Sequence, residues 1–486
     1  MRAVDSSEVA GGAPARGYPA WVGAGMYASM LVAAVVVFLV IRRIGTALRS
    51  THEVVLTSGL PGSREVVSLV QVLVALLTIV CVSRAAGSLF AKIRQPPVVG
   101  EILAGLALGP SLFGKVAPGL SALLLPPAVA PVLSVFSQVG VILYMFLIGL
   151  ELDDSHLKRL RHATVAISHA SIAVPFLLGA ALALLLYPYA ARADVSFTAF
   201  AMFCGAAMSV TAFPVLTRIL RERGMLGSPV GQLAMACAAV DDVTAWCLLA
   251  VVVGVVKADA SRAAVTVTLT ALYVFLMLTV VKPWLRRFVE RHRSMDATQP
   301  VLAVALVGLL LSSLATELIG IHAIFGSFIL GVVVPSDSKI ASGIARRLEG
   351  LVLALLLPIF FVHAGARVQL GLLHSPTHWL LCGLVVATAC LGKCGGTLVA
   401  ARLTGQGWRD ALTLATLMNT RGLVELVVLN VGLELGVLTP TLFTMFVIMA
   451  VLTTAATSPV LSLLARTVAA PLSERTVDRR LRSPPA

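Results

Sequence analysis

Two adjacent carboxylates lie inside the apolar stretch Leu233-Ala-Met-Ala-Cys-Ala-Ala-Val-Asp-Asp-Val-Thr-Ala-Trp-Cys-Leu-Leu-Ala250. A membrane-spanning helix needs about 20 predominantly apolar residues, and this stretch with its apolar flanks is long enough. A carboxylate at membrane depth costs at least ~2.5–3.5 kcal/mol on insertion scales, so such residues usually mark an ion pathway or a proton relay. Asp241 and Asp242 are therefore the leading candidates for a functional site. The alternative is a pair that neighbouring helices neutralise and that serves packing alone.

The composition of the whole chain agrees with a membrane protein. Of the 486 residues, 58% are hydrophobic and only 12% are charged. The cysteines lie in apolar segments and form no Cys-x-x-Cys pair, so we interpret them as small buried side chains rather than disulfides or metal ligands. The sequence predicts an all-α, polytopic membrane protein that needs no cofactor.

Apolar segments recur along the chain at lengths that suit membrane spans. The later thirteen form a consistent transmembrane domain over residues 66–464, followed by a short basic tail over 465–486. An N-terminal segment, residues 1–65, precedes them and contains an expected extra transmembrane helix, for which an interfacial helix is the alternative. The fourteen segments, the extra one first, are 18–41, 66–83, 97–112, 132–152, 164–186, 197–219, 231–256, 264–283, 301–319, 321–335, 349–367, 379–403, 408–433 and 439–464.

The positive charge of the chain follows its predicted topology. Loops rich in Lys and Arg alternate with poorly charged loops, and all the rich loops fall on one side of the thirteen-span arrangement. By the positive-inside rule this side is the cytoplasm, and the basic C-terminal tail lies there too. The net charge of +14 therefore reflects membrane orientation, and nucleic acid is not an expected partner. We expect a multi-pass protein of the cell membrane, with the lipid bilayer as its surroundings.

Two stretches of the transmembrane domain resemble each other. Gly100-Glu-Ile-Leu-Ala-Gly105-Leu-Ala-Leu-Gly-Pro110 aligns with Gly326-Ser-Phe-Ile-Leu-Gly331-Val-Val-Val-Pro335, with both glycines in register. Phe146-Leu-Ile-Gly149 similarly echoes Phe361-Val-His-Ala-Gly365. The two copies begin an odd number of spans apart, so they must be inverted relative to each other. Inverted repeats with the substrate bound between them are typical of many secondary transporters.

Two segments at equivalent positions of the repeats are poorly suited to continuous helices. Segment 197–219 contains Ser209-Val-Thr211-Ala-Phe-Pro214, in which the proline removes a backbone donor. Segment 408–433 contains Met418-Asn419-Thr420-Arg421-Gly422, which is polar at mid-depth. Interrupted helices at matching positions indicate a transport site, where freed carbonyls line a cavity. The alternative for each is a kink without a ligand, which is common in membrane helices.

Further ionisable residues lie at membrane depth. Lys393 lies well inside an apolar run beside Gly392, Gly395 and Gly396, which suggests close helix packing rather than a lysine that snorkels to the interface. A buried ammonium needs a carboxylate, and neighbouring helical residues point ~100° apart. One aspartate can therefore pair with Lys393 while the other faces the cavity.

A second pair of opposite charges lies on one predicted helix. Arg421 and Glu425 are four residues apart, a spacing at which opposite charges can neutralise each other. A role in gating or in shaping the electric field is the alternative. Both possibilities remain open from the sequence alone.

These residues resemble the monovalent cation:proton antiporter-2 family, especially its plant cation/H⁺-exchanger branch and the bacterial relatives of that branch. The resemblance covers about Val66 to Leu464 and rests on specific motifs. They are Gln95-Pro-Pro-Val-Val-Gly-Glu-Ile-Leu-Ala-Gly105, Phe146-Leu-Ile-Gly-Leu-Glu-Leu-Asp153, Val210-Thr-Ala-Phe-Pro214, Val240-Asp-Asp-Val-Thr-Ala-Trp246, Gly320-Ile-His-Ala-Ile-Phe-Gly326, Leu391-Gly-Lys393 and Met418-Asn-Thr-Arg-Gly-Leu-Val-Glu-Leu426.

The resemblance implies a sodium/proton antiporter-like fold in which two broken helices cross, and a homodimer. It assigns Asp242 as the cation and proton carrier and Asp241 as the partner of Lys393. Arg421 stands where plant exchangers often carry lysine, which keeps the charge. The resemblance also implies that the chain exchanges Na⁺ or K⁺ for protons.

In the mechanism we expect, Asp242 releases its proton and binds the cation with help from Thr211, Ser209 and freed carbonyls. A monovalent cation channel, proton-gated or ungated, is the alternative, but no filter-like repeated motif is present. An intramembrane aspartyl protease needs carboxylates that face each other from different helices, so adjacent aspartates exclude this enzyme. A second titratable group at Asp241 favours electrogenic exchange, whereas a lasting Asp241–Lys393 pair would make exchange one for one.

Overall fold

The computed structural model describes residues 20–48, 68–93, 95–151, 162–257, 260–291, 298–336 and 338–469. These residues are mainly helical and contain no β-strand, which confirms the predicted all-α class. Most of the predicted N-terminal segment 1–65 and of the tail 465–486 lies outside them. The helices are α1 Ala20–Gly45, α2 Leu69–Lys92, α3 Pro97–Leu108, α4 Phe113–Val116, α5 Pro118–Leu124, α6 Ala130–Glu151, α8 His162–Ala190, α9 Phe197–Ser209, α10 Phe213–Glu222, α11 Pro229–Lys257, α12 Ala260–Leu276, α13 Lys282–Arg291, α14 Gln299–Ile319, α15 Ala323–Val333, α16 Lys339–Leu351, α17 Leu357–Ala366, α18 Pro376–Leu403, α19 Trp408–Met418, α20 Leu423–Glu434 and α21 Pro440–Ala469.

Each predicted transmembrane segment falls on helix. Among the described residues, ten helices are long and apolar enough to cross a membrane. The remaining segments of the thirteen correspond to the broken helices α9–α10 and α19–α20 and to the short apolar helix α15. The helices at the predicted segments 264–283 and 349–367 are longer than expected. A π-helical turn, Met277–Val281, joins α12 to α13, and another, Val352–Leu356, joins α16 to α17.

The expected extra helix at 18–41 corresponds to α1. This helix packs against α8, where the rings of Phe38 and Phe176 lie 5.7 Å apart. Ile41 is buried in the same contact, whereas Val32, Val36 and neighbouring apolar residues are exposed. An apolar outer face suits a helix that meets lipid, as the predicted extra span would. That α1 crosses the membrane stays a prediction.

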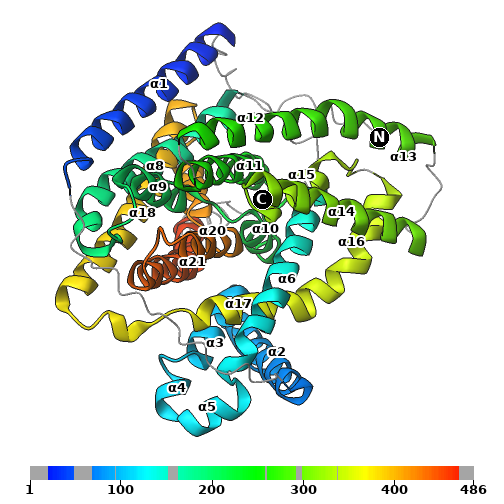
Figure 1. Ribbon diagram of the computed structural model, residues 1–486. Helices are drawn as coiled ribbons and strands as arrows, with labels where there is room; N and C mark the ends of the chain where they lie inside the picture. Colours follow the sequence, from blue (N-terminus) through cyan, green and yellow to red (C-terminus); the bar gives the residue numbers. More distant parts are fainter. Residues whose placement is uncertain are drawn as a thin grey trace, which may run out of the picture.

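The helices of the transmembrane domain form two groups. One set of extensive contacts joins α2, α3, α6 and α14–α17, which we call the frame helices. A second set of extensive contacts joins α8–α11 and α18–α21, which we call the crossing helices. Figure 1 shows α8, α9 and α18 on one side of the molecule, with α2, α6 and α16 on the other. This division provides two bodies that could move relative to each other.

The predicted inverted repeat explains how the frame helices pack. A Cβ on Gly105 of α3 would lie 2.7 Å from the Cα of Val362 on α17, and one on Gly365 of α17 would lie 2.9 Å from Gly105. A Cβ on Gly149 of α6 and one on Gly331 of α15 would each lie within 2.8 Å of the other residue's Cα. The repeat matches Gly105 with Gly331 and Gly365 with Gly149. The contact between Gly105 and Gly365 in one place therefore corresponds to the contact between Gly331 and Gly149 in the other. This reciprocity agrees with an inverted relation between the two repeats.

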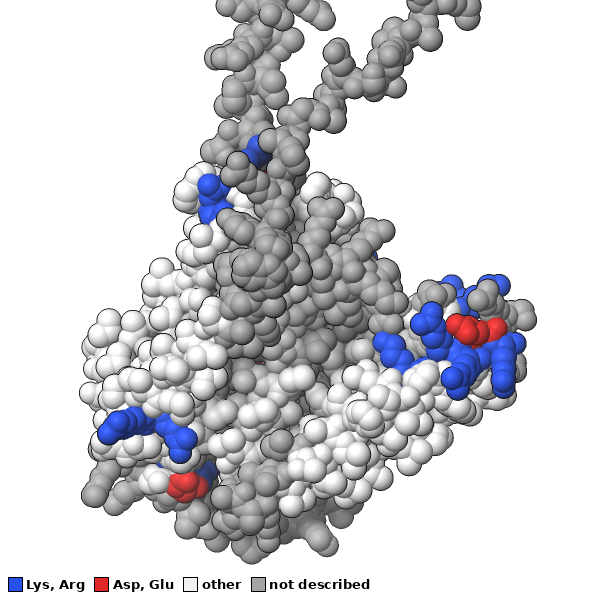
Figure 2. All heavy atoms as spheres, turned by 90° about the horizontal axis from the view of Figure 1, so that it is seen from above, with Lys and Arg blue, Asp and Glu red and all other residues white. Residues whose placement is uncertain are grey.

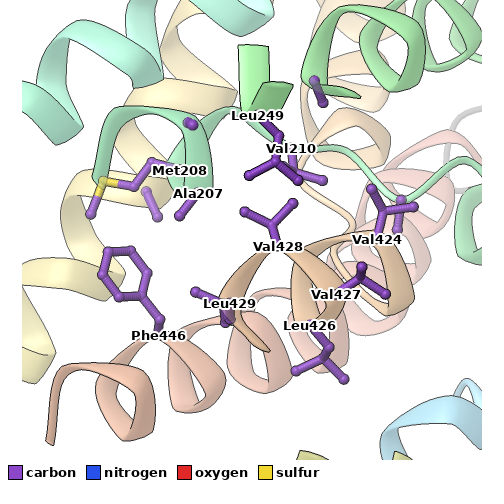
Figure 3. Packing of buried hydrophobic residues seen from close by; sticks show 14 of the residues in the cluster. Ala207, Met208, Val210, Leu249, Val424, Leu426, Val427, Val428, Leu429 and Phe446 are labelled. Atoms are coloured by element: carbon purple, nitrogen blue, oxygen red, sulfur yellow. The ribbon is translucent and has the colours of Figure 1, made fainter. Parts of the chain in front are cut away.

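The crossing helices surround α20 with apolar side chains. Figure 3 shows side chains from α9, α11, α20 and α21 directed toward one another. Most residues of α20 are apolar and buried, and Glu425, Asn430 and Glu434 are its polar exceptions. The α20 residues of this apolar cluster pack against residues of the neighbouring segments, and all of them are buried. The labelled members are Ala207, Met208, Val210, Leu249, Val424, Leu426, Val427, Val428, Leu429 and Phe446.

Charged residues of the described chain gather at the margins of one face. In Figure 2 the Lys and Arg atoms concentrate in patches separated by uncharged surface. One patch lies where Figure 1 places α13, which carries Lys282, Arg286, Arg287 and Arg291. The described residues drawn between the patches are uncharged, which suits contact with lipid.

The glycine contacts of the frame yield a stability prediction. A methyl group at position 149 would lie 2.5 Å from the carbonyl oxygen of Phe328, which is backbone and cannot turn aside. Gly149→Ala should therefore destabilise the protein by about 1–3 kcal/mol, as overpacking does, and lower its melting temperature in detergent. Gly350→Ala in α16 is the matched control, because nothing lies within 4 Å of its added Cβ. Equal melting temperatures for both variants would contradict the close packing of α6 on α15.

Candidate functional site

The first broken helix consists of α9 and α10. Ser196 begins α9 by accepting a hydrogen bond from the Ala199 backbone, and the helix ends at Ser209. Val210 has extended backbone angles, φ −68° and ψ 136°, and α10 starts at Phe213 with Pro214 in its first turn. Proline is tolerated there because the first turn of a helix has no intrahelical acceptor for its missing N–H. The local sequence thus produces an extended link between two half-helices.

The second broken helix consists of α19 and α20. It is interrupted between Met418 and Leu423, where Gly422 adopts an extended conformation. The two interruptions meet, because the backbone N–H of Ala212 donates a hydrogen bond of 3.0 Å to the carbonyl of Thr420. This contact confirms the predicted crossing of two broken helices. Backbone polar groups that each helix leaves unpaired thus meet at the centre of the crossing helices.

Asp241 is surrounded by donors. Its Oδ1 accepts a hydrogen bond of 2.7 Å from Ser168, and its Oδ2 accepts bonds of 2.7 Å from Ser171 and 2.8 Å from Thr211. The ammonium group of Lys393 lies 3.0 Å from the same Oδ2, and all four partners are buried. Buried charges are stable when they are paired and hydrogen-bonded, and this carboxylate meets both conditions. The geometry thus selects Asp241 as the partner of Lys393, a choice that residue spacing left open.

Asp242 has the opposite surroundings. Its side chain is fully buried, and neither of its oxygens has a hydrogen bond of normal geometry among the residues described. The backbone N–H of Phe213, at the start of α10, interacts with this carboxyl group from the N-terminal end of that half-helix. A buried carboxylate that has no ion pair and no hydrogen bond of normal geometry is costly in its ionised form. Asp242 is therefore stable here when a proton or a cation neutralises it.

Arg421 joins the two broken helices from the second interruption. Its guanidinium donates to the carbonyls of Ala207 at 3.0 Å and Met208 at 2.7 Å, which belong to the last turn of α9. It also pairs with Glu425, and both side chains are fully buried. A cation at a helix C-terminus satisfies unpaired carbonyls and interacts favourably with the helix dipole. Arg421 therefore caps α9 while Glu425 neutralises its charge.

The other predicted site residues lie near the crossing but have different contacts. Ser209 donates to the carbonyls of Gly205 at 2.7 Å and Ile172 at 3.1 Å, and no hydrogen bond of the described residues joins it to either aspartate. The side chain of Thr420 donates to the carbonyl of Leu417. Asn419 is buried next to Cys390, and its side-chain oxygen is without a hydrogen bond within the described ranges.

Three residues of the site were not predicted from the sequence. Ser168 and Ser171 lie on α8 and both reach Asp241. Thr454 on α21 accepts from the N–H of Arg421 at 2.9 Å and donates to its carbonyl at 2.7 Å, which holds the second interruption in place. A signal for the serines does exist, since residues three apart share a helix face and Ser168-His-Ala-Ser171 is a polar run within an apolar segment.

A small cavity lined by both polar and apolar side chains lies between the frame helices and α20. Its volume is about 30 Å³, and its lining includes Ser137 and Gln138 of α6 and Asn430 of α20. Arg367, which follows α17, donates to Asn430 at 2.9 Å and pairs with Glu434 at 3.3 Å. These contacts form a polar link between the two groups of helices. Movement of one group against the other must break or shift this link.

Comparisons with known proteins agree with this geometry. The chain matches the family model described as sodium/hydrogen exchanger, transmembrane, over residues 72–466. The Na⁺/H⁺ antiporter NhaS4 of Synechocystis sp. is 43% identical over 395 residues, which cover 81% of this chain and 96% of that protein. Cation/H⁺ antiporter 20 of Arabidopsis thaliana is 38% identical over 394 residues, 78% of this chain. K⁺/H⁺ antiporter 1 of Saccharomyces cerevisiae is 33% identical over 384 residues, 77% of this chain.

The plant and yeast relatives are longer than this chain, whose matches span 47% and 44% of their lengths. The structure of the sodium/proton antiporter MjNhaP1 from Methanocaldococcus jannaschii superposes with a TM-score of 0.62 over 82% of this chain and all of that one, at 17% identity. This likeness confirms the predicted antiporter fold. The family consists of transporters rather than enzymes, and antiporter names favour exchange over a channel. The chain therefore belongs to the sodium/hydrogen exchanger family, as its sequence motifs predicted.

Proposed function

We propose that this protein exchanges Na⁺ or K⁺ for protons across the membrane and that Asp242 is the carrier. The observation that carries this proposal is the contrast between two adjacent carboxylates. Asp241 accepts hydrogen bonds from three hydroxyl groups and pairs with Lys393, whereas Asp242 is equally buried and has no such partner in the described part of the chain. A carboxyl group with no side-chain donor and no ion pair, beside the crossing of two broken helices, is available to a proton or a cation.

Competition for Asp242 couples the two ions. At low pH the carboxyl group holds a proton, and as the pH rises it ionises and binds the cation instead. An ionised carboxylate with neither ligand carries the full cost of burial, so the empty site crosses the membrane slowly. Only the proton-loaded and cation-loaded forms cross readily. Because the same group must hold one ion or the other, movement in one direction requires return with the other ion.

The division into frame and crossing helices supports alternating access. The carrier, its neighbours and both interruptions all belong to the crossing helices, so this group can move as a unit against the frame. The Arg367 link to Asn430 and Glu434 lies between the groups and would open during this movement. The proposed molecule is a homodimer in the plasma membrane with a cytoplasmic C-terminus, in line with its basic loops and its family.

Proteoliposomes with a trapped pH-sensitive dye test this function. We expect Na⁺ or K⁺ added outside acid-loaded vesicles to trigger alkalinisation of the lumen that saturates with cation concentration. An equal concentration of choline should have no effect, because its quaternary ammonium group is too large for a site beside Asp242. Parallel additions of Na⁺ and K⁺ identify the preferred cation. Cation entry without any change in lumenal pH would support the channel alternative and contradict exchange.

A further inference from the structure

The cavity between the frame helices and α20 has a defined place along the path across the membrane. Its lining includes Ser134 near the start of α6, His322 just before α15, His363 near the end of α17 and Glu434 at the end of α20. The basic residues that the positive-inside rule assigns to the cytoplasm flank the opposite ends of these helices. In the proposed topology the cavity therefore belongs to the external half of the protein.

Helix α20 connects this cavity to the surroundings of the carrier. The helix begins at the second interruption, beside the crossing of the broken helices, and its last residue, Glu434, lines the cavity. At 1.5 Å per residue, its 12 residues span about 18 Å. A cation that approaches Asp242 along α20 from the outside therefore meets the cavity first.

The cavity suits a monovalent cation in its size and its ligands. Carbonyl oxygens can replace the hydration shell of such an ion, and Gln138, Asn430 and Glu434 bring amide and carboxylate oxygens to the lining. One water molecule needs about 10–15 Å³ of this kind of volume, so about 30 Å³ holds a cation that keeps one water. Nε2 of His363 is buried and has no hydrogen bond within the described residues, so it can bind that water.

A positive charge of the protein already contacts two of these oxygens. Nη1 of Arg367 donates to Oδ1 of Asn430 at 2.9 Å and lies 3.3 Å from Oε1 of Glu434. The side chains of Arg367 and Glu434 are 26% and 40% exposed, so ions in water can reach the pair. Ion pairs with this much exposure are weak, because water screens them. A free cation can therefore compete with the guanidinium for the same two oxygens.

We propose that Asn430 and Glu434 form an external entry subsite for the exchanged Na⁺ or K⁺, and that the guanidinium of Arg367 occupies this subsite until a cation displaces it. This inference rests on the proposed function and adds a second binding position to it. Arg367 belongs to the frame, whereas both oxygens belong to the crossing helices. A cation that enters from outside thus removes a contact between the two groups of helices and frees the movement that carries it inward.

Two substitutions with opposite expected effects test the subsite. Arg367→Gln removes the competing charge and keeps both oxygens, so the KM for external cation should fall about two- to fivefold, as expected for the loss of an exposed ion pair. Glu434→Gln removes the negative charge that attracts the cation, so the same KM should rise by a similar factor. If the pair served only to hold the helices together, both variants would break the same contact and would shift KM in the same direction.

The measurement uses membrane vesicles of both orientations, from cells whose own sodium/proton and potassium/proton exchangers have been deleted. Right-side-out vesicles present the external face to added Na⁺ or K⁺, and everted vesicles present the cytoplasmic face. Initial rates of alkalinisation of an acid-loaded lumen, over a series of cation concentrations, give the KM for each face. We expect the opposite shifts of the two variants at the external face. Shifts confined to the cytoplasmic face would overturn an external subsite.

The controls separate the subsite from a general effect of charge. Arg286→Gln and Glu290→Gln remove the two sides of an exposed ion pair on α13, and both should leave the external KM unchanged. Arg367→Lys keeps a positive charge within reach of the two oxygens, so its external KM should stay close to that of the native protein.

Each outcome bears either on the subsite or on the function beneath it. Folded variants at Arg367 and Glu434 whose external KM shifts in the same direction, or not at all, overturn the subsite while exchange itself stands. If Arg367→Gln does not fold, Glu434→Gln decides alone, because a mere contact between helices predicts a lower KM and the subsite predicts a higher one. Absence of exchange by the native protein in both orientations would instead contradict the proposed function.

Discussion

Replacing Asp242 by asparagine should reduce cation/proton exchange to the rate of protein-free liposomes. Asparagine has nearly the same shape, but it neither releases a proton nor supplies a negative charge to a cation. Competition between the two ions, which couples their movement, is therefore lost. The measurement is cation-driven alkalinisation of acid-loaded proteoliposomes at matched protein content.

The same substitution should leave folding intact. Asp242 is fully buried and no side chain of the described residues donates a hydrogen bond to it, so the substitution breaks no side-chain hydrogen bond and removes the cost of burying a charge. The melting temperature in detergent should equal or exceed that of the native protein. Asp194→Asn is the matched control, because Asp194 is exposed and pairs with nearby Arg192 far from the carrier in sequence, and it should retain exchange. Substantial exchange by the Asp242 variant would remove this residue from the mechanism.

Removing the ammonium group of Lys393 should cause a large loss of stability. Lys393→Met keeps most of the apolar side chain but leaves the charge of Asp241 buried and unpaired. Breaking a buried ion pair by removing one partner costs about 3–5 kcal/mol. The variant should therefore melt at a clearly lower temperature, whereas Lys92→Met, at the exposed end of α2, should melt close to the native protein.

A double-mutant cycle separates the pair from its surroundings. Asp241→Asn combined with Lys393→Met removes both charges, so it should recover part of the stability that Lys393→Met loses. Recovery should be incomplete, because asparagine offers one acceptor oxygen where Ser168, Ser171 and Thr211 now find two. Independent sites give additive losses of stability, whereas residues in contact do not. Losses that simply add would show that Asp241 and Lys393 do not interact in the folded protein.

The sequence was a good guide wherever a residue type was out of place in the membrane. Asp241, Asp242 and Lys393 were recognisable because a charge in an apolar segment is costly and needs a reason. Pro214 and Gly422 indicated the two interruptions because they disturb a helix in known ways. Each of these signals is local. The resemblance to a family then supplied what local signals lack, the crossing of the interrupted helices and the division of roles between the two aspartates.

The contacts of hydroxyl groups could not be predicted in the same way. Serine and threonine in a helix commonly donate to the carbonyl one turn earlier, as Thr217 and Thr244 do here. Such a residue is compatible with an apolar segment and gives no sign of a distant partner. Ser168 and Ser171 reach an aspartate about 70 residues further along the chain. The contact of Arg421 with the end of α9 was missed for a similar reason, since Glu425 already accounted for its charge.

The reciprocal glycine contacts of the frame have a consequence for synthesis of the protein. The grooves at Gly105 and Gly149 are filled by α17 and α15, which belong to the second repeat. Contacts between the region after α3 and the end of α17 span 257 residues of chain. At about 5–20 residues per second, the ribosome needs roughly 10–50 s to make that length. During this interval the first repeat is in the membrane without the helices that complete it. Whatever occupies those grooves meanwhile, lipid or a membrane chaperone, must leave before the transporter can assemble.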